Sequence, residues 1–196
     1  MTAEHATLPV AARVRRLEER LIGAGLVTGE ELDEILARYL ATASPVNGAR
    51  LVARAWADGA FRERLLGDAN TAVKELGLSM GGGLQEQRLK VVANTPRRHN
   101  VIVCTLCSCY PIALLGPSPG WYKSEAYRSR VVREPRAVLA EFGLRLPEDV
   151  EITVWDSSAE SRYMVLPLRP PGTEGMSEEQ LTGLVTREGL IGTAAV

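Results

Sequence analysis

All three cysteines of this 196-residue chain fall within six residues, in the segment Val103-Cys104-Thr105-Leu106-Cys107-Ser108-Cys109. Spacings of three and two residues let the three sulfur atoms converge on one face of a tight loop. The residues just before them, Val101-Ile102-Val103, are apolar and β-branched, a pattern typical of a short strand. We therefore expect a fold in which a strand ends directly in a loop that carries three sulfurs.

The remaining composition is that of an ordinary folded protein. The chain is 45% hydrophobic and 24% charged, with a formal net charge of −1, and at this length it can bury a sizeable core without disulfides. An odd, clustered set of cysteines is poor material for a disulfide framework. Such a run more often binds a metal or carries redox chemistry.

Charge and hydropathy argue against two classes of partner. A net charge near zero argues against nucleic acid or an anionic membrane surface as the main partner. The longest apolar stretches are far short of the roughly 20 residues that a membrane-spanning helix needs, and the N-terminus lacks the apolar region of a signal peptide. We expect a cytoplasmic protein.

The pattern along the chain changes near residue 80. Helical periodicity and capping residues predict helices over 11–24, 28–40 and 44–56, and two shorter ones that begin near Asp58 and Asp68. Three glycines at 81–83 interrupt this pattern. Beyond them, strands are predicted at 88–93, 101–103, 150–155 and 162–166, and helices over 121–142, split at Pro135, and over 177–187.

These elements predict an α+β protein with a helical N-terminal arm, residues 1–80, followed by a layered α-β-β-α domain, residues 81–196, that carries the cysteine loop. The arm can form a packed subdomain of its own. The glycine break also leaves room for it to pack against a different chain, and the pattern does not decide between the two.

The cysteine loop, residues 104–109, offers five strong donors to one ion. The sulfurs of Cys104, Cys107 and Cys109 can be joined by the backbone nitrogens of Ser108 and Cys109. Such a set suits a low-spin trivalent cobalt or iron ion and leaves a sixth position for water or substrate.

Two other chemistries remain open at this point. A tetrahedral zinc site needs a fourth ligand; because His99 lies at the other end of the strand, that ligand would have to be a carboxylate or come from a partner. A thioredoxin-like redox pair of Cys104 and Cys107 fits a motif after a strand, but it leaves Cys109 without a role.

The cysteine loop resembles the metal-binding loop of nitrile hydratase alpha subunits, and Thr105 is similar to the cobalt class of that family. The resemblance runs from about residue 85 to 192. It includes Asn94-Thr95-Pro96, His99-Asn100-Val101, Trp121-Tyr122-Lys123-Ser124, Tyr127-Arg128, the run from Arg130 to Arg136, Arg162-Tyr163-Met164-Val165-Leu166-Pro167, Gly172-Thr173-Glu174-Gly175 and Leu190-Ile191-Gly192.

The resemblance implies a role for each residue of the site. The ion would be Co(III), with Fe(III) as the alternative. Cys104 would remain a thiolate, while Cys107 and Cys109 would be oxidised to sulfinic and sulfenic acid. The nitrogens of Ser108 and Cys109 would complete the ligand set. Gln85 stands where the family places a glutamine near the active site, so Cys109 and Gln85 are the candidate catalytic residues.

The implied reaction is hydration of a small-molecule nitrile to the amide, together with a β subunit in one or two chains and a metallochaperone or activator protein. Two routes are open: Lewis-acid activation of the nitrile or of bound water, or attack by the sulfenate oxygen of Cys109. The related thiocyanate hydrolase carries a very similar loop and is the alternative function. A metal-binding or redox protein without enzymatic activity is the third.

The chain departs from the family pattern in two places. Ile112-Ala113 stands where the family usually has Trp-Pro, and Ala93 replaces a usual glutamate. The loss of an indole near the metal should enlarge the pocket, which predicts a bulkier nitrile, such as a nucleoside nitrile. We expect Trp121 and Tyr122 to be core or interface aromatics rather than substrate contacts.

Overall fold

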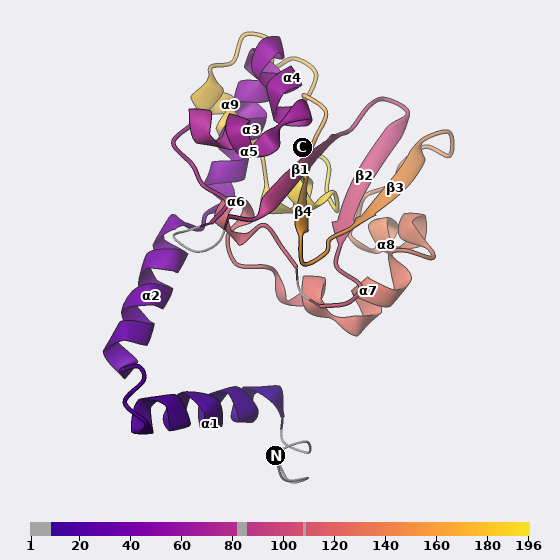
Figure 1. Cartoon of the computed structure of the whole chain (residues 1–196). Helices are drawn as coiled ribbons and strands as arrows, with labels where there is room; N and C mark the ends of the chain where they lie inside the picture. Colours follow the sequence, from indigo (N-terminus) through magenta and orange to yellow (C-terminus); the bar gives the residue numbers. More distant parts are fainter. Residues whose placement is uncertain (1–8, 82–85, 108) are drawn as a thin grey trace. The chain divides into compact units, whose positions relative to one another are not determined.

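The computed structural model describes residues 9–81, 86–107 and 109–196, and the chain forms two compact units, residues 1–41 and 42–196 (Figure 1). The first unit holds α1 (Val10–Gly23) and α2 (Gly29–Thr42). The expected capping box opens α2: the Glu31 amide donates to Thr28 Oγ1 at 3.1 Å, and the Thr28 amide donates to Glu31 Oε2 at 2.7 Å. Among the described helices, none is both long and apolar enough to cross a bilayer.

The second unit contains the remaining elements. In chain order they are α3 (Pro45–Ala57), α4 (Gly59–Gly67), α5 (Ala69–Glu75), β1 (Arg88–Ala93), β2 (Arg98–Val103), α6 (Ile112–Leu115), the 3-10 helix η2 (Gly120–Lys123), α7 (Glu125–Arg130), α8 (Pro135–Glu141), β3 (Glu151–Asp156), β4 (Ser161–Leu166), α9 (Glu178–Leu184) and α10 (Arg187–Ile191).

The strands form two parallel pairs, β1 with β4 and β2 with β3 (Figure 1). In the second pair Arg98 lies opposite Glu151 and Val103 lies opposite Asp156, so the carboxyl ends of β2 and β3 meet at one edge. The mixed α+β class and the strand positions are confirmed. The layered α-β-β-α order remains a prediction.

The compact units divide at residue 41/42, whereas the glycine run suggested a boundary near residue 80. The reason is the core of the second unit, in which Leu51 and Val52 of α3 are buried together with Val101 and Ile102 of β2. Helices α3 to α5 therefore share one hydrophobic core with the strands. Burial of these apolar side chains is the main favourable contribution to its folding.

Side-chain caps fix most of the helix boundaries. Ser44, Asp58, Asp68 and Ser177 each accept a hydrogen bond from a backbone amide in the first turn of the helix that follows, and Pro135 stands at the start of α8. The predicted helical region 121–142 is divided into η2, α7 and α8. The helix predicted over 177–187 ends at Leu184 as α9, and a separate helix, α10, begins at Arg187. Helix α6 was not predicted because four residues are too few to show a helical period.

Candidate metal centre

Strand β2 places the first cysteine in the protein interior. Cys104 follows the last residue of β2 directly and is fully buried. The end of the strand is held by a hydrogen bond from the Ser157 amide to the Val103 carbonyl at 2.7 Å. The start of the cysteine loop is therefore fixed by the β2–β3 pair.

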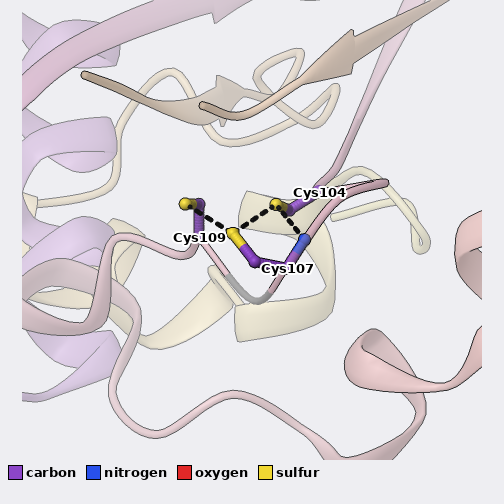
Figure 2. Close-up of side chains that lie close together, drawn as sticks. All are labelled: Cys104, Cys107 and Cys109. Carbon is purple, nitrogen blue, oxygen red and sulfur yellow. Dashed lines mark hydrogen bonds between the residues drawn. The ribbon is translucent and has the colours of Figure 1, made fainter. Parts of the chain in front are cut away.

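The three sulfurs converge as the spacing predicts (Figure 2). Cys107 Sγ lies 3.3 Å from Cys104 Sγ and 3.1 Å from Cys109 Sγ, and all three sulfurs lie within 4.8 Å of one another. The Cys107 amide also donates to Cys104 Sγ at 3.3 Å. Both sulfur–sulfur distances exceed the roughly 2.05 Å of a disulfide bond, so the sulfurs remain available as separate ligands.

The chemistry of the donor set fits a metal ion. Three sulfurs that all lie within 4.8 Å of one another can bind a single ion, and thiolate sulfur is a ligand of zinc and of other transition metals. Among the described residues the cluster contains three cysteines and no histidine or carboxylate, so it does not supply the four protein ligands of a closed structural zinc site.

Exposure differs sharply among the loop residues. Cys104 and Cys109 are buried, whereas Cys107 is exposed and the Leu106 side chain is 88% exposed. The tip of the loop thus presents an apolar side chain and a sulfur to solvent, while the other two sulfurs face the interior.

The buried environment keeps the last cysteine protonated when no cation is bound. Burial, reinforced by the hydrogen bond with Cys107, raises the pKa of the Cys109 thiol to about 12, against the opposing positive charge of Arg162. A metal can bind there only by displacing the proton. Metal binding at this cysteine is therefore coupled to release of a proton.

A carboxylate from the neighbouring strand holds the first turn of the loop. Asp156 Oδ1 accepts from the Thr105 amide at 2.9 Å, and Asp156 Oδ2 accepts from the Thr105 hydroxyl at 2.5 Å. Sequence reasoning missed Asp156, because the two residues are 51 positions apart and the parallel pairing of β2 with β3 is not visible in residue spacing.

Two buried tyrosines donate hydrogen bonds to the cysteine loop and to the strand before it. The Tyr122 hydroxyl donates to the Cys109 carbonyl at 3.2 Å, and the Tyr127 hydroxyl donates to the Ile102 carbonyl at 2.7 Å. Burial raises the pKa of both phenols well above their usual value, so both remain donors. Tyr122 is a core aromatic, as predicted, and Trp121 packs against the same core.

The remaining predicted residues fall into two groups. Gln85 and Ser108 lie outside the described residues. His99 lies at the start of β2, the end of the strand away from the cysteine loop, where its Nε2 bonds the Gly192 carbonyl at 2.7 Å. It takes no part in the sulfur cluster, in agreement with its predicted place on the strand.

The family model for the alpha chain of nitrile hydratase matches residues 8–194. The chain belongs to this family. A nitrile hydratase alpha chain from Rhodococcus rhodochrous, named a low-molecular weight cobalt-containing subunit alpha, is 52% identical over 185 residues, which cover 94% of this chain and 88% of that one.

Two further similar proteins carry other names. Thiocyanate hydrolase subunit gamma from Thiobacillus thioparus is 44% identical over 186 residues, covering 91% of this chain and 76% of that one. The solved structure of a double mutant of the Fe-type nitrile hydratase from Comamonas testosteroni Ni1 superposes with a TM-score of 0.86 at 44% identity, covering 96% of this chain and 92% of that chain. The relatives' names thus include cobalt and iron forms.

Proposed function

We propose that this chain is the metal-carrying α subunit of a nitrile hydratase, which hydrates an organic nitrile to the amide. The observation that carries the proposal is the convergence of the Cys104, Cys107 and Cys109 sulfurs at the end of β2, in a chain about half identical to a cobalt-containing nitrile hydratase subunit.

The proposed ligands are the three cysteine sulfurs and the backbone nitrogens of Ser108 and Cys109. Trivalent cobalt is the proposed ion, with iron as the alternative. Bound there, such an ion supplies Lewis-acid activation. Oxidation of Cys107 to sulfinic acid and of Cys109 to sulfenic acid is part of the proposal, with dioxygen or a peroxide as the oxidant and the source of the three added oxygen atoms. The exposure of Cys107 supports access of the oxidant to the first of these sulfurs.

A partner chain is proposed to complete the site. The exposed sulfur of Cys107 and the 88% exposed side chain of Leu106 lie at the loop tip, where a β subunit would bury both and exclude water from the reacting atoms. Delivery of the metal by an activator or metallochaperone protein belongs to the same proposal. Gln85 is proposed as a further active-site residue.

The proposed substrate is a bulky nitrile, of which a nucleoside nitrile is one candidate. Ile112 is half-buried three residues after Cys109, at the start of α6, where the family usually has a tryptophan. An Ile112→Trp variant should lose kcat/KM for bulky nitriles relative to acrylonitrile-sized ones by about tenfold, as expected for one poorly fitting group in a pocket. An unchanged ratio of the two kcat/KM values would contradict the size argument.

Coexpression with the β subunit in cobalt medium tests the proposed function. We expect one cobalt per chain, a cysteine peptide heavier by three oxygen atoms, and amide formation from nitriles. Cys109→Ala should abolish turnover, whereas Ser129→Ala, a change on an exposed face of α7, should not. A fully metallated Cys109→Ala enzyme that keeps its turnover would rule out the role proposed for this cysteine.

Thiocyanate hydrolysis is the second candidate, because the gamma subunit of that enzyme is 44% identical to this chain. The same preparation separates the two functions. Release of carbonyl sulfide from thiocyanate, without amide formation from any nitrile, would favour the second.

A further inference from the structure

The η2–α7 segment, residues 120–130, contacts the cysteine loop through side chains that donate to backbone carbonyls. The three bonds are Tyr122 Oη to the Cys109 carbonyl at 3.2 Å, Tyr127 Oη to the Ile102 carbonyl at 2.7 Å, and Arg128 Nη1 to the Cys107 carbonyl at 3.1 Å. The first bond holds the end of the loop, the second holds the strand that leads into it, and the third holds its middle.

Of the three bonds, the one from Arg128 holds the most exposed part of the loop. The backbone at Cys104 is fixed by the core, and that at Cys109 is buried beside Tyr122. Cys107 is exposed, yet its sulfur lies between the other two, at 3.3 and 3.1 Å. A small rotation of the backbone at Cys107 would move the middle sulfur away from both neighbours.

The bond from Arg128 restricts that rotation. A guanidinium donates through a planar, rigid group, and hydrogen bonds from charged donors are stronger than neutral ones. A donor at the Cys107 carbonyl oxygen therefore restrains the backbone of that residue. Arg128 comes from a helix that Tyr127 ties to β2, which gives the donor a fixed base.

We propose that Arg128 is a positioning residue for the metal site: its guanidinium holds the exposed middle cysteine in the geometry that binds the ion. The inference rests on the proposed metal site and deepens it. It predicts that loss of the guanidinium weakens metal binding without unfolding the chain.

Arg130, two residues further along α7, provides a matched control. Its guanidinium pairs with Glu134 at 2.6 Å and with Glu141 at 2.6 Å. Arg128→Met and Arg130→Met therefore remove the same group from the same helix, and only the first removes a bond to the cysteine loop.

The test titrates Co²⁺ into the reduced full-length chain and follows sulfur-to-cobalt absorption, with the melting temperature of the metal-free chain as the folding control. Arg128→Met should bind Co²⁺ about tenfold more weakly than the wild type, with an altered absorption band and a near-normal melting temperature. Arg130→Met should bind Co²⁺ like the wild type, with a lower melting temperature.

Wild-type Co²⁺ affinity and an unchanged spectrum in Arg128→Met would overturn the inference. If that variant does not fold, Arg128→Gln is judged by the same criterion. Failure of the wild-type chain to bind cobalt both in this titration and after coexpression with the β subunit and the activator protein would sink the proposed metal site. That outcome is seen in the wild type alone, so it is distinguishable from an effect of the variants.

Discussion

Gly192 shows how tightly single residues are fitted around the start of β2. It ends α10 with a φ of +91°, a left-handed conformation that favours glycine. A Cβ placed there would overlap the Asn100 carbonyl oxygen and would lie 2.9 Å from Val101 Cα. Both neighbours are backbone atoms of a buried strand, so neither can move aside easily.

Substitution of Gly192 by alanine should therefore be strongly destabilising. Backbone strain and overlap together predict a loss of about 3 kcal/mol in the free energy of unfolding. Gly183→Ala is the control, because a Cβ added to this helical glycine would meet nothing within 4 Å, and it should gain about 0.5–1 kcal/mol. Urea unfolding of the metal-free chains measures both changes. Equal stabilities of the two variants would contradict the packing argument.

At the scale of elements, a polar network joins β2 and β3 to Asn94, which directly follows β1, and to Gly192, which directly follows α10. His99 Nε2 bonds the Gly192 carbonyl at 2.7 Å, and His99 Nδ1 lies 3.3 Å from Asn94 Nδ2. Asn94 Oδ1 accepts from the Asn100 amide at 2.8 Å, and Asn100 Oδ1 accepts from Trp155 Nε1 at 2.8 Å. An amide donor facing Nδ1 requires a neutral ring, with its proton on Nε2.

This network makes stability depend on pH. Burial lowers the pKa of His99 below its ordinary value of 6.5, although the bond to Gly192 opposes the shift. As the pH falls below about 6.5 the unfolded chain binds a proton that the folded chain does not, so folding stability falls. The slope reaches at most about 1.4 kcal/mol per pH unit. Urea unfolding between pH 7.5 and 5 should show this loss in the wild type and a flatter profile in His99→Gln; parallel profiles would exclude His99 as the source.

The elements that sequence reasoning found were those with local signals. The capping box at Thr28 and Glu31, the caps at Ser44 and Ser177, and the cysteine spacing all act over a few residues, so they could be read directly. The bonds from Asp156 to Thr105 and from Arg128 to Cys107 span 51 and 21 residues. They depend on strand pairing and helix packing, which residue spacing does not encode.

At the scale of the whole molecule, the N-terminal unit differs from the rest in what it buries. Among the described residues of α1 and α2 no side chain is buried. Val14 and Leu17 of α1 are 58% and 56% exposed, and Leu36 and Leu40 of α2 are 56% and 52% exposed. Each pair has helical spacing, so each helix presents an apolar stripe.

Helices of this length are marginal in water without packing partners, and each of these two has 14 residues. The β subunit proposed above is the partner expected to cover the stripes. Removal of residues 1–41 should therefore leave the melting temperature of the remaining chain within a few degrees, because the described core residues all lie beyond that segment. It should weaken association with the β subunit.

Paired substitutions within the full chain sharpen this prediction. Val14→Glu with Leu17→Glu places charges on the α1 stripe, whereas Arg13→Glu with Arg16→Glu changes charged residues of the same helix. Burying two carboxylates in an apolar interface is costly, so the first variant should bind the β subunit at least about tenfold more weakly, while the second should lose less. Copurification and sedimentation with the β subunit measure both. If the two variants bind equally well, the stripe is not the contact surface, and the arm does not join the subunits through its apolar face.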